Sequence, residues 1–242
     1  MHTKTETTTL APVSEKLKRQ YVRFAFYKLD PSFRKLDANI RLQAKEEVLS
    51  LVDLFREKMI LLSYSLLATR ADADLMFWQV SDDLDVFDNF ASRLIHSGMG
   101  PYLHITHSFL SMTRHTVYVD KINPEHSKSR IHIKPGDHKY LFVYPFVKTH
   151  EWYQLPMAER QKMMDQHIVM GNKYPSVKIN TTYSFGLDDP DFVLAFESDS
   201  PEDFLDLVME MRGAKARLYT LKDTPIFTCI AKDPKWILDS IG

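Results

Sequence analysis

The sequence predicts an α+β fold: a dimeric α+β barrel made from two tandem ferredoxin-like halves in one chain. Three observations support it. Each half reads as β-α-β-β-α-β, the ferredoxin-like order. The two halves share identical residues at one constant sequence offset, which Tyr27 and Tyr144 also follow. The composition, 44% hydrophobic and 26% charged, is that of an ordinary globular protein. The identical pairs are Asp72/Asp189, Asp74/Asp191, Ser81/Ser198, Asp82/Asp199 and Phe87/Phe204.

In the first half, alternation of apolar residues indicates strands, and apolar positions three or four apart indicate helices. A bend at residues 70–72 separates two of the strands, and acidic residues open the second helix. We expect a strand at 21–29, a helix at 38–59, strands at 61–69 and 74–80, a helix at 82–94 and a strand at 104–112.

The second half repeats this order. Pro156 and Pro201 stand where helices begin, because proline is favoured at the first helical position. We expect a strand at 139–147, a helix from 155 to about 171, strands at 177–185 and 192–197, a helix at 201–212 and a strand at 225–230.

These elements divide the chain into an N-terminal arm (1–18), a first half (19–116), a linker with two prolines (117–138) and a second half (139–242), forming one integrated domain. The alternative is that both halves are generic α+β units and that the repeat is accidental. Several identities at one fixed offset make this alternative the weaker one.

Charge and cysteine content exclude several function classes. The net charge of −1 lacks the basic excess of a nucleic-acid-binding surface. Cys229 is the only cysteine and lies in an apolar run, so we expect a buried side chain and a reducing, cytoplasmic setting. The polar, Thr-rich start does not resemble a signal peptide, and no apolar stretch approaches the ~20 residues of a membrane span.

The helix expected at 155–171 carries an unusual face. Residues three and four apart share a helix face, so His167 lies with Met163, Met164, Met170 and Gly171. Such a face suits a flat apolar ligand that needs one axial nitrogen, although a hydrogen-bonded core histidine is the commoner explanation. The first half has Ser50 at the matching offset, so the histidine is not part of the repeated scaffold.

The strand that precedes this helix carries a second group. Alternation puts Tyr144, Phe146 and Lys148 on one face, and Pro145 interrupts the ladder. A lysine on an inward face requires an anion or solvent nearby. The pattern leaves both open: an anion-binding lysine and a solvated lysine at the rim.

These residues resemble the haem-binding half of the chlorite dismutase family, and above all its coproheme decarboxylase branch. The resemblance spans nearly the whole chain from about Tyr21 and is densest in the second half. The segments that carry it are Tyr144-Pro-Phe-Val-Lys148, Glu151-Trp152-Tyr153-Gln-Leu-Pro156, Arg160-Gln-Lys-Met-Met164, His167, Gly171-Asn-Lys-Tyr174, Phe185-Gly-Leu-Asp-Asp189 and Met209-Glu-Met-Arg212, with Leu75-Met-Phe77 in the first half.

The resemblance implies a homopentamer that binds one porphyrin per subunit through the iron, with His167 as the axial ligand. Chlorite-degrading members have a distal arginine at the position of Ile179 and a glutamate at the position of Ala216. Without these two groups, no guanidinium holds an oxyanion over the iron and the imidazole is less basic. Chlorite dismutation is therefore disfavoured.

The decarboxylase branch is marked by the Tyr144 and Lys148 pair. It implies that hydrogen peroxide drives the loss of CO2 from two propionates of iron coproporphyrin III (coproheme), giving haem b. Tyr144 would relay the oxidising equivalent and Lys148 would anchor a propionate. The resemblance also implies porphyrin contacts for Arg130, Trp152 and Lys215, and an upstream ferrochelatase as a partner.

Two departures qualify this assignment. Better-known decarboxylases have a Gln or a His near the iron where this chain has Ile179, and the segment is one residue shorter than in the Gln branch, so Asn180 or Thr181 is an alternative. A serine of the Gln branch is replaced by Lys215. The competing functions are a chlorite dismutase or haem peroxidase, a non-catalytic haem carrier or sensor, and a structural protein without a porphyrin.

Overall fold

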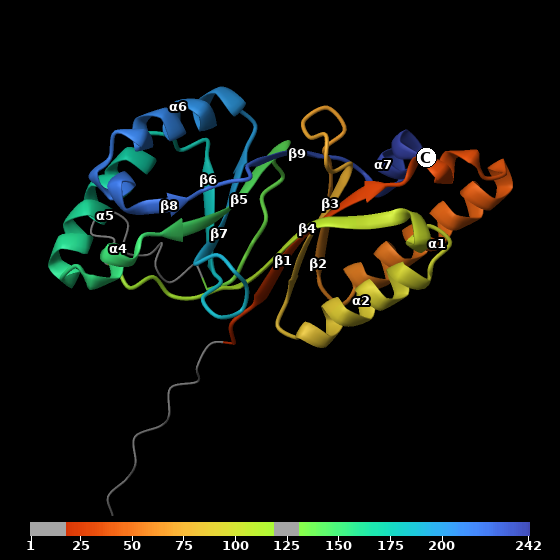
Figure 1. Cartoon of the computed structure of the whole chain (residues 1–242), viewed down its shortest axis with the longest axis horizontal. Coiled ribbons are helices and arrows are strands. Elements are labelled where there is room, and N and C mark those ends of the chain that lie inside the picture. The colour runs from red at the N-terminus through yellow and green to blue at the C-terminus, as the bar shows by residue number, and fades with distance from the viewer. Residues whose placement is uncertain (1–17, 119–130) are drawn as a thin grey trace, which may run out of the picture.

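The computed structural model describes residues 18–118 and 131–242. Two lobes lie side by side along its long axis (Figure 1). The first lobe contains β1 (Tyr21–Leu29), η1 (Pro31–Lys35), α1 (Ala38–Arg56), β2 (Ile60–Ser65), β3 (Leu75–Ser81), α2 (Leu84–His96), η2 (Gly100–Tyr102) and β4 (Leu103–Met112).

The second lobe repeats the order and adds short elements. It contains β5 (Tyr140–Lys148), α4 (His150–Gln154), α5 (Met157–Gly171), β6 (Lys178–Tyr183), β7 (Phe192–Ser198), α6 (Pro201–Arg212), η3 (Lys215–Tyr219), β8 (Thr220–Lys222) and β9 (Phe227–Ala231). The final helix, α7 (Pro234–Ile241), returns to the first lobe (Figure 1).

The strands form a closed antiparallel barrel. The first half contributes β4-β1-β3-β2 and the second β6-β7-β5-β9, both in the ferredoxin-like order. The halves meet through β4 with β6 and β2 with β9, while β8 extends from the edge of β5. The predicted α+β barrel of two ferredoxin-like halves is therefore confirmed.

A packed core fills the space between the two sheets. It includes Phe24, Phe26, Trp78 and Phe227 from the strands of both halves. Cys229 is part of this core, and burial raises the pKa of its thiol, as expected of a structural cysteine. The helices lie outside, with α1, α2 and α7 on the first sheet and α5 and α6 on the second (Figure 1). Among the described residues, no helix has the length and apolar character needed to cross a membrane.

The repeat is visible in equivalent hydrogen bonds. The Ser81 hydroxyl accepts from the Asp83 backbone N–H (3.2 Å), and the Ser198 hydroxyl accepts from the Ser200 backbone N–H (3.0 Å). These two bonds lie just before α2 and α6, the second long helix of each half.

A second pair of bonds corrects one match made from the sequence. The Asp74 carboxylate accepts from the Leu29 backbone N–H (3.0 Å), and the Asp191 carboxylate accepts from that of Lys148 (2.7 Å). Leu29 and Lys148 are therefore counterparts. By the strand register, the counterpart of Tyr144 is Ala25, so the match of Tyr144 with Tyr27 was wrong.

Several element bounds differ from the expected ones. The strand expected at 61–69 ends at Ser65, because Leu66 turns the chain and its carbonyl accepts from the Thr69 backbone N–H (2.9 Å). The short helix α4 and the final helix α7 were not predicted. In α7, the Asp233 carboxylate caps the Lys235 backbone N–H and Pro234 stands at the first position.

Candidate functional site

A cavity lies between the second sheet and the helices α5 and α6. Side chains from β5, β6 and β7 form one wall, and the helices and η3 form the others. The lining residues are Arg114, Thr116, Tyr118, Tyr144, Phe146, Lys148, Trp152, Met164, His167, Ile179, Thr181, Tyr183, Phe192, Leu194, Phe196, Leu207, Val208, Met211, Arg212, Ala214, Ala216, Arg217, Thr220 and Asp223.

The helix α5 borders this cavity, and its side chains are less buried than those of a helix packed on a sheet. None of its residues is buried, although it covers the sheet for 15 residues. His167 and Met164 are partly buried and line the cavity, whereas the other methionines of the predicted face do not line it. Burial and the charge of Lys148 lower the pKa of His167 to about 4, so its imidazole is neutral at neutral pH. A neutral imidazole is the form that ligates a metal.

The strand β5 supplies the opposite side. Tyr144, Phe146 and Lys148 all line the cavity, as strand alternation predicts. The Tyr144 ring stacks on Phe196, with ring centroids 5.7 Å apart and planes at 12°. Burial of Tyr144 raises the pKa of its phenol, so the neutral phenol is the stable form.

Lys148 is half enclosed beneath Trp152. Its Nζ donates to the Ala216 carbonyl (3.0 Å) and lies 4.2 Å from the Trp152 ring centroid. Burial and the nearby Arg217 guanidinium lower the pKa of Lys148 to about 8. Among the described residues, no carboxylate lies within 4.0 Å of this ammonium group, so its charge is available to an anionic ligand.

The strand β6 carries the three residues considered for the position near the iron, Ile179, Asn180 and Thr181, and they do not all face the cavity. Ile179 and Thr181 line the cavity, as alternate residues of one strand face. Asn180 points into the barrel instead, where its amide donates to the buried Glu197 carboxylate (2.9 Å). Asn180 is therefore removed from the candidate site.

Of the three remaining predicted site residues, only Trp152 lines the cavity in the described part of the chain. Trp152 lines the cavity and is only 2% exposed. Lys215 is exposed and is not one of the residues that line the cavity; its neighbours Ala216 and Arg217 occupy that place. Arg130 lies outside the described residues.

Several cavity residues were missed by the sequence analysis. Arg212 and Arg217 both donate to the Asp223 carboxylate, at 3.0 and 2.5 Å. Arg114 lies against the Tyr183 ring (5.9 Å). Arg212 ends one of the segments that carry the resemblance, and Arg217 follows Ala216, whose position the resemblance singled out, so both had a usable signal. Nothing in the sequence pattern marks Arg114 or Asp223.

The charges of the lining residues favour an anionic ligand. Four cationic side chains, Arg114, Lys148, Arg212 and Arg217, accompany one carboxylate, that of Asp223, in this set. Lys148 and Arg217 are partly buried, whereas Arg114 and Arg212 are exposed. Such cations bind carboxylates or phosphates through charge-assisted hydrogen bonds. The walls between them are aromatic and aliphatic, which suits a ligand with an apolar body and acidic edges.

The metal-binding capacity is limited to one nitrogen. Within residues 18–118 and 131–242, no group of three or more His, Cys, Asp and Glu side chains is placed to hold a metal ion. His167 alone lines the cavity among the described histidines. A metal ion here therefore requires most of its ligands from a prosthetic group, and the donor set fits an iron porphyrin that His167 would hold through its imidazole.

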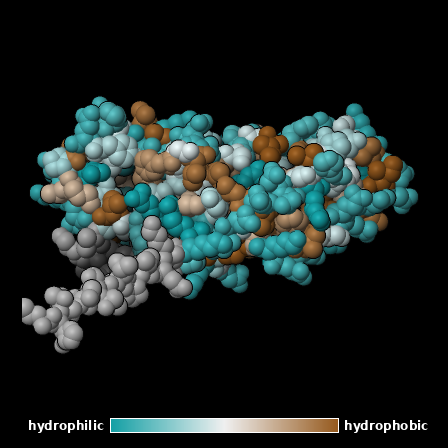
Figure 2. Space-filling model, turned by 90° about the horizontal axis from the view of Figure 1, so that it is seen from below, coloured by the Kyte–Doolittle hydropathy of each residue, from teal (hydrophilic) through white to brown (hydrophobic). Residues whose placement is uncertain are grey.

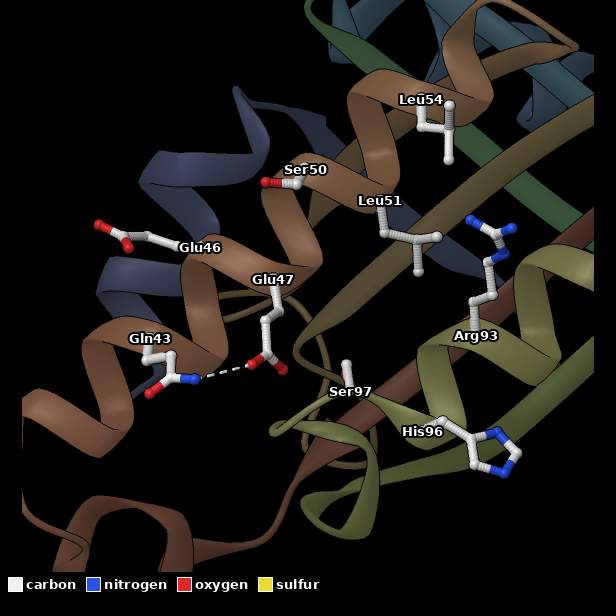
Figure 3. Close-up of a pocket in the computed structure, with 9 residues that line it drawn as sticks. All are labelled: Gln43, Glu46, Glu47, Ser50, Leu51, Leu54, Arg93, His96 and Ser97. Atoms are coloured by element: carbon white, nitrogen blue, oxygen red, sulfur yellow. Dashed lines mark hydrogen bonds between the residues drawn. The ribbon is translucent and has the colours of Figure 1, made fainter.

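A second hollow lies far from these residues, between α1 and α2 (Figure 3). The residues that line this hollow include Ser50, Glu46, Glu47, Arg93 and His96. Ser50 is exposed on this outer side of α1, whereas His167 faces the cavity. The matching of His167 with Ser50 by sequence offset therefore does not correspond to equivalent helix faces.

Comparisons with known proteins agree with this architecture. A family model described as chlorite dismutase matches residues 41–232. A coproheme decarboxylase of Mycolicibacterium smegmatis is 31% identical over 166 residues, covering 68% of this chain and 70% of that protein. A coproheme decarboxylase of Staphylococcus carnosus is 29% identical over 155 residues, covering 60% of this chain and 62% of that protein.

Solved structures show the same relationship. Chlorite dismutase from Candidatus Nitrospira defluvii in complex with imidazole superposes with a TM-score of 0.83 at 27% identity, covering 92% of this chain and 94% of that one. A heme-binding protein from Thermus thermophilus gives 0.82 at 26% identity, covering 93% and 96%. The extent of these matches, together with the barrel and its cavity, shows that the chain belongs to the chlorite dismutase family.

Proposed function

We propose that this protein is a hydrogen peroxide-dependent coproheme decarboxylase, which converts two propionates of iron coproporphyrin III to vinyl groups and so produces haem b. The observation that carries the proposal is the presence of Tyr144, Lys148 and His167 on one cavity. The two decarboxylase relatives named above support the same activity.

The cavity fits the substrate in both shape and charge. Its walls include Phe146, Ile179 and Leu194, which suit the flat face of a porphyrin. Its basic side chains suit a ligand with four propionates, because each carboxylate needs a compensating charge once it leaves water.

We assign a separate role to each of three side chains. His167 holds the iron, and its low pKa keeps the imidazole unprotonated for this purpose. Lys148 binds the carboxylate of a reactive propionate through its Nζ and fixes the propionate beside Tyr144. Tyr144 would give up an electron and its phenolic proton and then regain a hydrogen atom from the propionate Cβ. Loss of a second electron from the propionate would release CO2 and leave the vinyl group, so that each propionate gives two electrons to one peroxide, which yields two waters. The bound iron supplies the redox chemistry with peroxide.

The positions of Ile179 and Thr181 bear on the speed of the reaction. Both line the cavity, and neither carries the guanidinium that would bind an oxyanion over the iron. We infer that chlorite dismutation is disfavoured and that peroxide cleavage receives little help from the side chain at position 179. The homopentamer, the cytoplasmic location and the ferrochelatase partner remain predictions.

The decisive experiment combines iron coproporphyrin III with the purified protein, adds hydrogen peroxide in steps and follows the porphyrin by mass spectrometry. We expect stepwise loss of two CO2, abolished by Tyr144→Phe. The matched control is Tyr102→Phe, because Tyr102 lies in the first lobe against Phe33. Bleaching of a tightly bound porphyrin without loss of CO2 would refute the decarboxylase and indicate a carrier or a weak peroxidase.

A further inference from the structure

Two oxidisable rings form a route from the cavity toward the surface. Trp152 lines the cavity, is 2% exposed and lies 5.6 Å from Tyr219, measured between ring centroids. Tyr219 ends η3 and is partly exposed, and Leu218 beside it is 81% exposed. The Thr149 backbone N–H donates to the Tyr219 carbonyl (2.9 Å) and fixes the two segments together.

The rings around Tyr144 form a different arrangement. Tyr144 stacks on Phe196, Phe196 contacts Phe204 at 5.2 Å, and Phe204 stacks on Phe142 at 3.9 Å. Phenylalanine is much harder to oxidise than tyrosine or tryptophan. The ring on which Tyr144 stacks therefore does not accept an oxidising equivalent from it. One on Trp152 can pass directly to Tyr219, which lies nearer to it than Tyr118, the other tyrosine in contact with its ring (6.4 Å between ring centroids).

Lys148 determines which of the two rings reacts first. Its ammonium lies 4.2 Å from the Trp152 ring centroid and is attracted to the π electrons of the indole. Removal of an electron from Trp152 would place two positive charges in contact, so the ammonium makes Trp152 the poorer electron donor. Trp152 should then be oxidised by equivalents that Tyr144 does not consume.

We propose that Trp152 and Tyr219 form an exit route that carries unused oxidising equivalents from the cavity to a small one-electron reductant of the ascorbate class at the surface. This inference rests on the proposed function, which supplies peroxide to the cavity. Each peroxide that is not used for decarboxylation takes two electrons and two protons and yields two waters.

The electrons travel one at a time. Trp152 gives one electron to the oxidised centre, and Tyr219 refills Trp152 and releases its phenolic proton to water. The reductant then returns an electron and a proton to Tyr219. Two such passes reduce one peroxide, so neither ring is consumed while the reductant is present.

The test uses the complete chain loaded with iron coproporphyrin III and excess peroxide, with a nitroso spin trap in place of the reductant and with peptide mapping by mass spectrometry. We expect the trap on Tyr219 in the unchanged protein. Trp152→Phe should remove most of that label. Tyr219→Phe, a milder change outside the cavity, should cause oxygen-addition products to accumulate on Trp152 and the porphyrin to bleach faster.

Trp236 provides a matched control. It also lies beneath a lysine, with Lys232 Nζ 4.8 Å from its ring centroid, but it is 47% exposed and belongs to α7 in the other lobe. Oxidation by peroxide in bulk solution would modify Trp236 before the buried Trp152. Trp236→Phe should leave the label on Tyr219 unchanged.

The same samples separate this inference from the proposed function. Loss of CO2 without label on Tyr219, or a label that survives Trp152→Phe, or modification that follows exposure, overturns the exit route alone. Label on Tyr219 without loss of CO2 supports the route and overturns the decarboxylase. The absence of both overturns both.

Discussion

The two lobes use one backbone plan, but the space beneath the helices differs. In the first lobe, α1 buries Ala44, Val48, Leu51, Val52 and Phe55 against its sheet. In the second lobe, α5 buries no residue and borders a cavity. The first lobe is thus packed beneath α1, whereas the second lobe has a cavity beneath α5. The two lobes lie side by side in Figure 1.

The difference arises from a few side chains at equivalent positions. The registers pair Ala25 with Phe77 in the first lobe and Tyr144 with Leu194 in the second. Large and small residues have exchanged strands at this point. Beyond it, the buried Leu29 is replaced by Lys148, while the same backbone bond to an aspartate is kept. The cavity of the second lobe is therefore formed without a change in the strand pairing that positions its lining residues.

One face of the molecule does not show this difference between the lobes. On that face, apolar side chains form separate patches among hydrophilic ones (Figure 2). Isolated apolar residues are normal on protein surfaces. The difference between the lobes that the structure shows lies beneath their helices.

We expect the largest difference in the free energy of unfolding from two single substitutions at the equivalent positions 29 and 148. Leu29→Lys buries an ammonium in a filled core and should lower the free energy of unfolding by about 4 kcal/mol or more. Lys148→Leu should raise it by about 1 kcal/mol, because an apolar side chain replaces a partly desolvated charge. Urea denaturation measures both. If both changes destabilise the protein equally, the lobes do not differ as described.

Substitutions at the equivalent positions Phe77 and Leu194 should give the next largest difference in stability. Phe77 is 1% exposed and contacts Phe90, so Phe77→Ala should cost about 3–5 kcal/mol by opening a cavity. Leu194 already borders the cavity, so Leu194→Ala should cost only about 1 kcal/mol. Thermal unfolding measured by circular dichroism distinguishes these values. A large loss at Leu194 would argue for a tightly packed second lobe.

The two helices can be compared in the same way. Val52→Ala in α1 removes two fully buried methyl groups and should cost about 2 kcal/mol. Met164→Ala in α5 should cost less than about 1 kcal/mol, because Met164 is only partly buried. Chemical denaturation of both variants without porphyrin provides the comparison. A cost at Met164 that matches the one at Val52 would contradict it.

The smallest effect concerns pH. The lowered pKa of Lys148, about 8, means that its ammonium is charged below that value and is lost as the pH rises through it. Binding of metal-free coproporphyrin III should therefore weaken by about tenfold, or ~1.4 kcal/mol, between about pH 7 and about pH 10, since bound carboxylates hold the proton on Lys148 somewhat above pH 8. Fluorescence titration measures the affinity. Lys148→Leu should bind weakly at both values and show no such dependence.

Most of the fold was predictable because its signals are local. Alternation identified every strand of the barrel and placed Tyr144, Phe146 and Lys148 on one face. The match of Tyr144 with Tyr27 failed because the two lobes keep one offset along β3 and β7 but a different one along β1 and β5. A repeat read at a single offset cannot register such a shift.

The site was less predictable where it depends on distant segments. Arg114 follows β4, and Asp223 follows β8, yet both line the same cavity as His167. Only the closed barrel brings them together. The final helix α7 had readable signals in Asp233 and Pro234, but it lies beyond the last strand of the repeat and has no place in the ferredoxin-like order that guided the prediction.

The position of α7 constrains how this protein is made. Ile237, Leu238 and Ile241 belong to the core of the first lobe, and the Arg34 guanidinium donates to the Ile241 carbonyl (2.8 Å). During synthesis from the N-terminus, the first lobe is therefore translated early but cannot complete its core until residues 234–241 have left the ribosome. The core of the first lobe is therefore completed only after the whole second lobe has been synthesised.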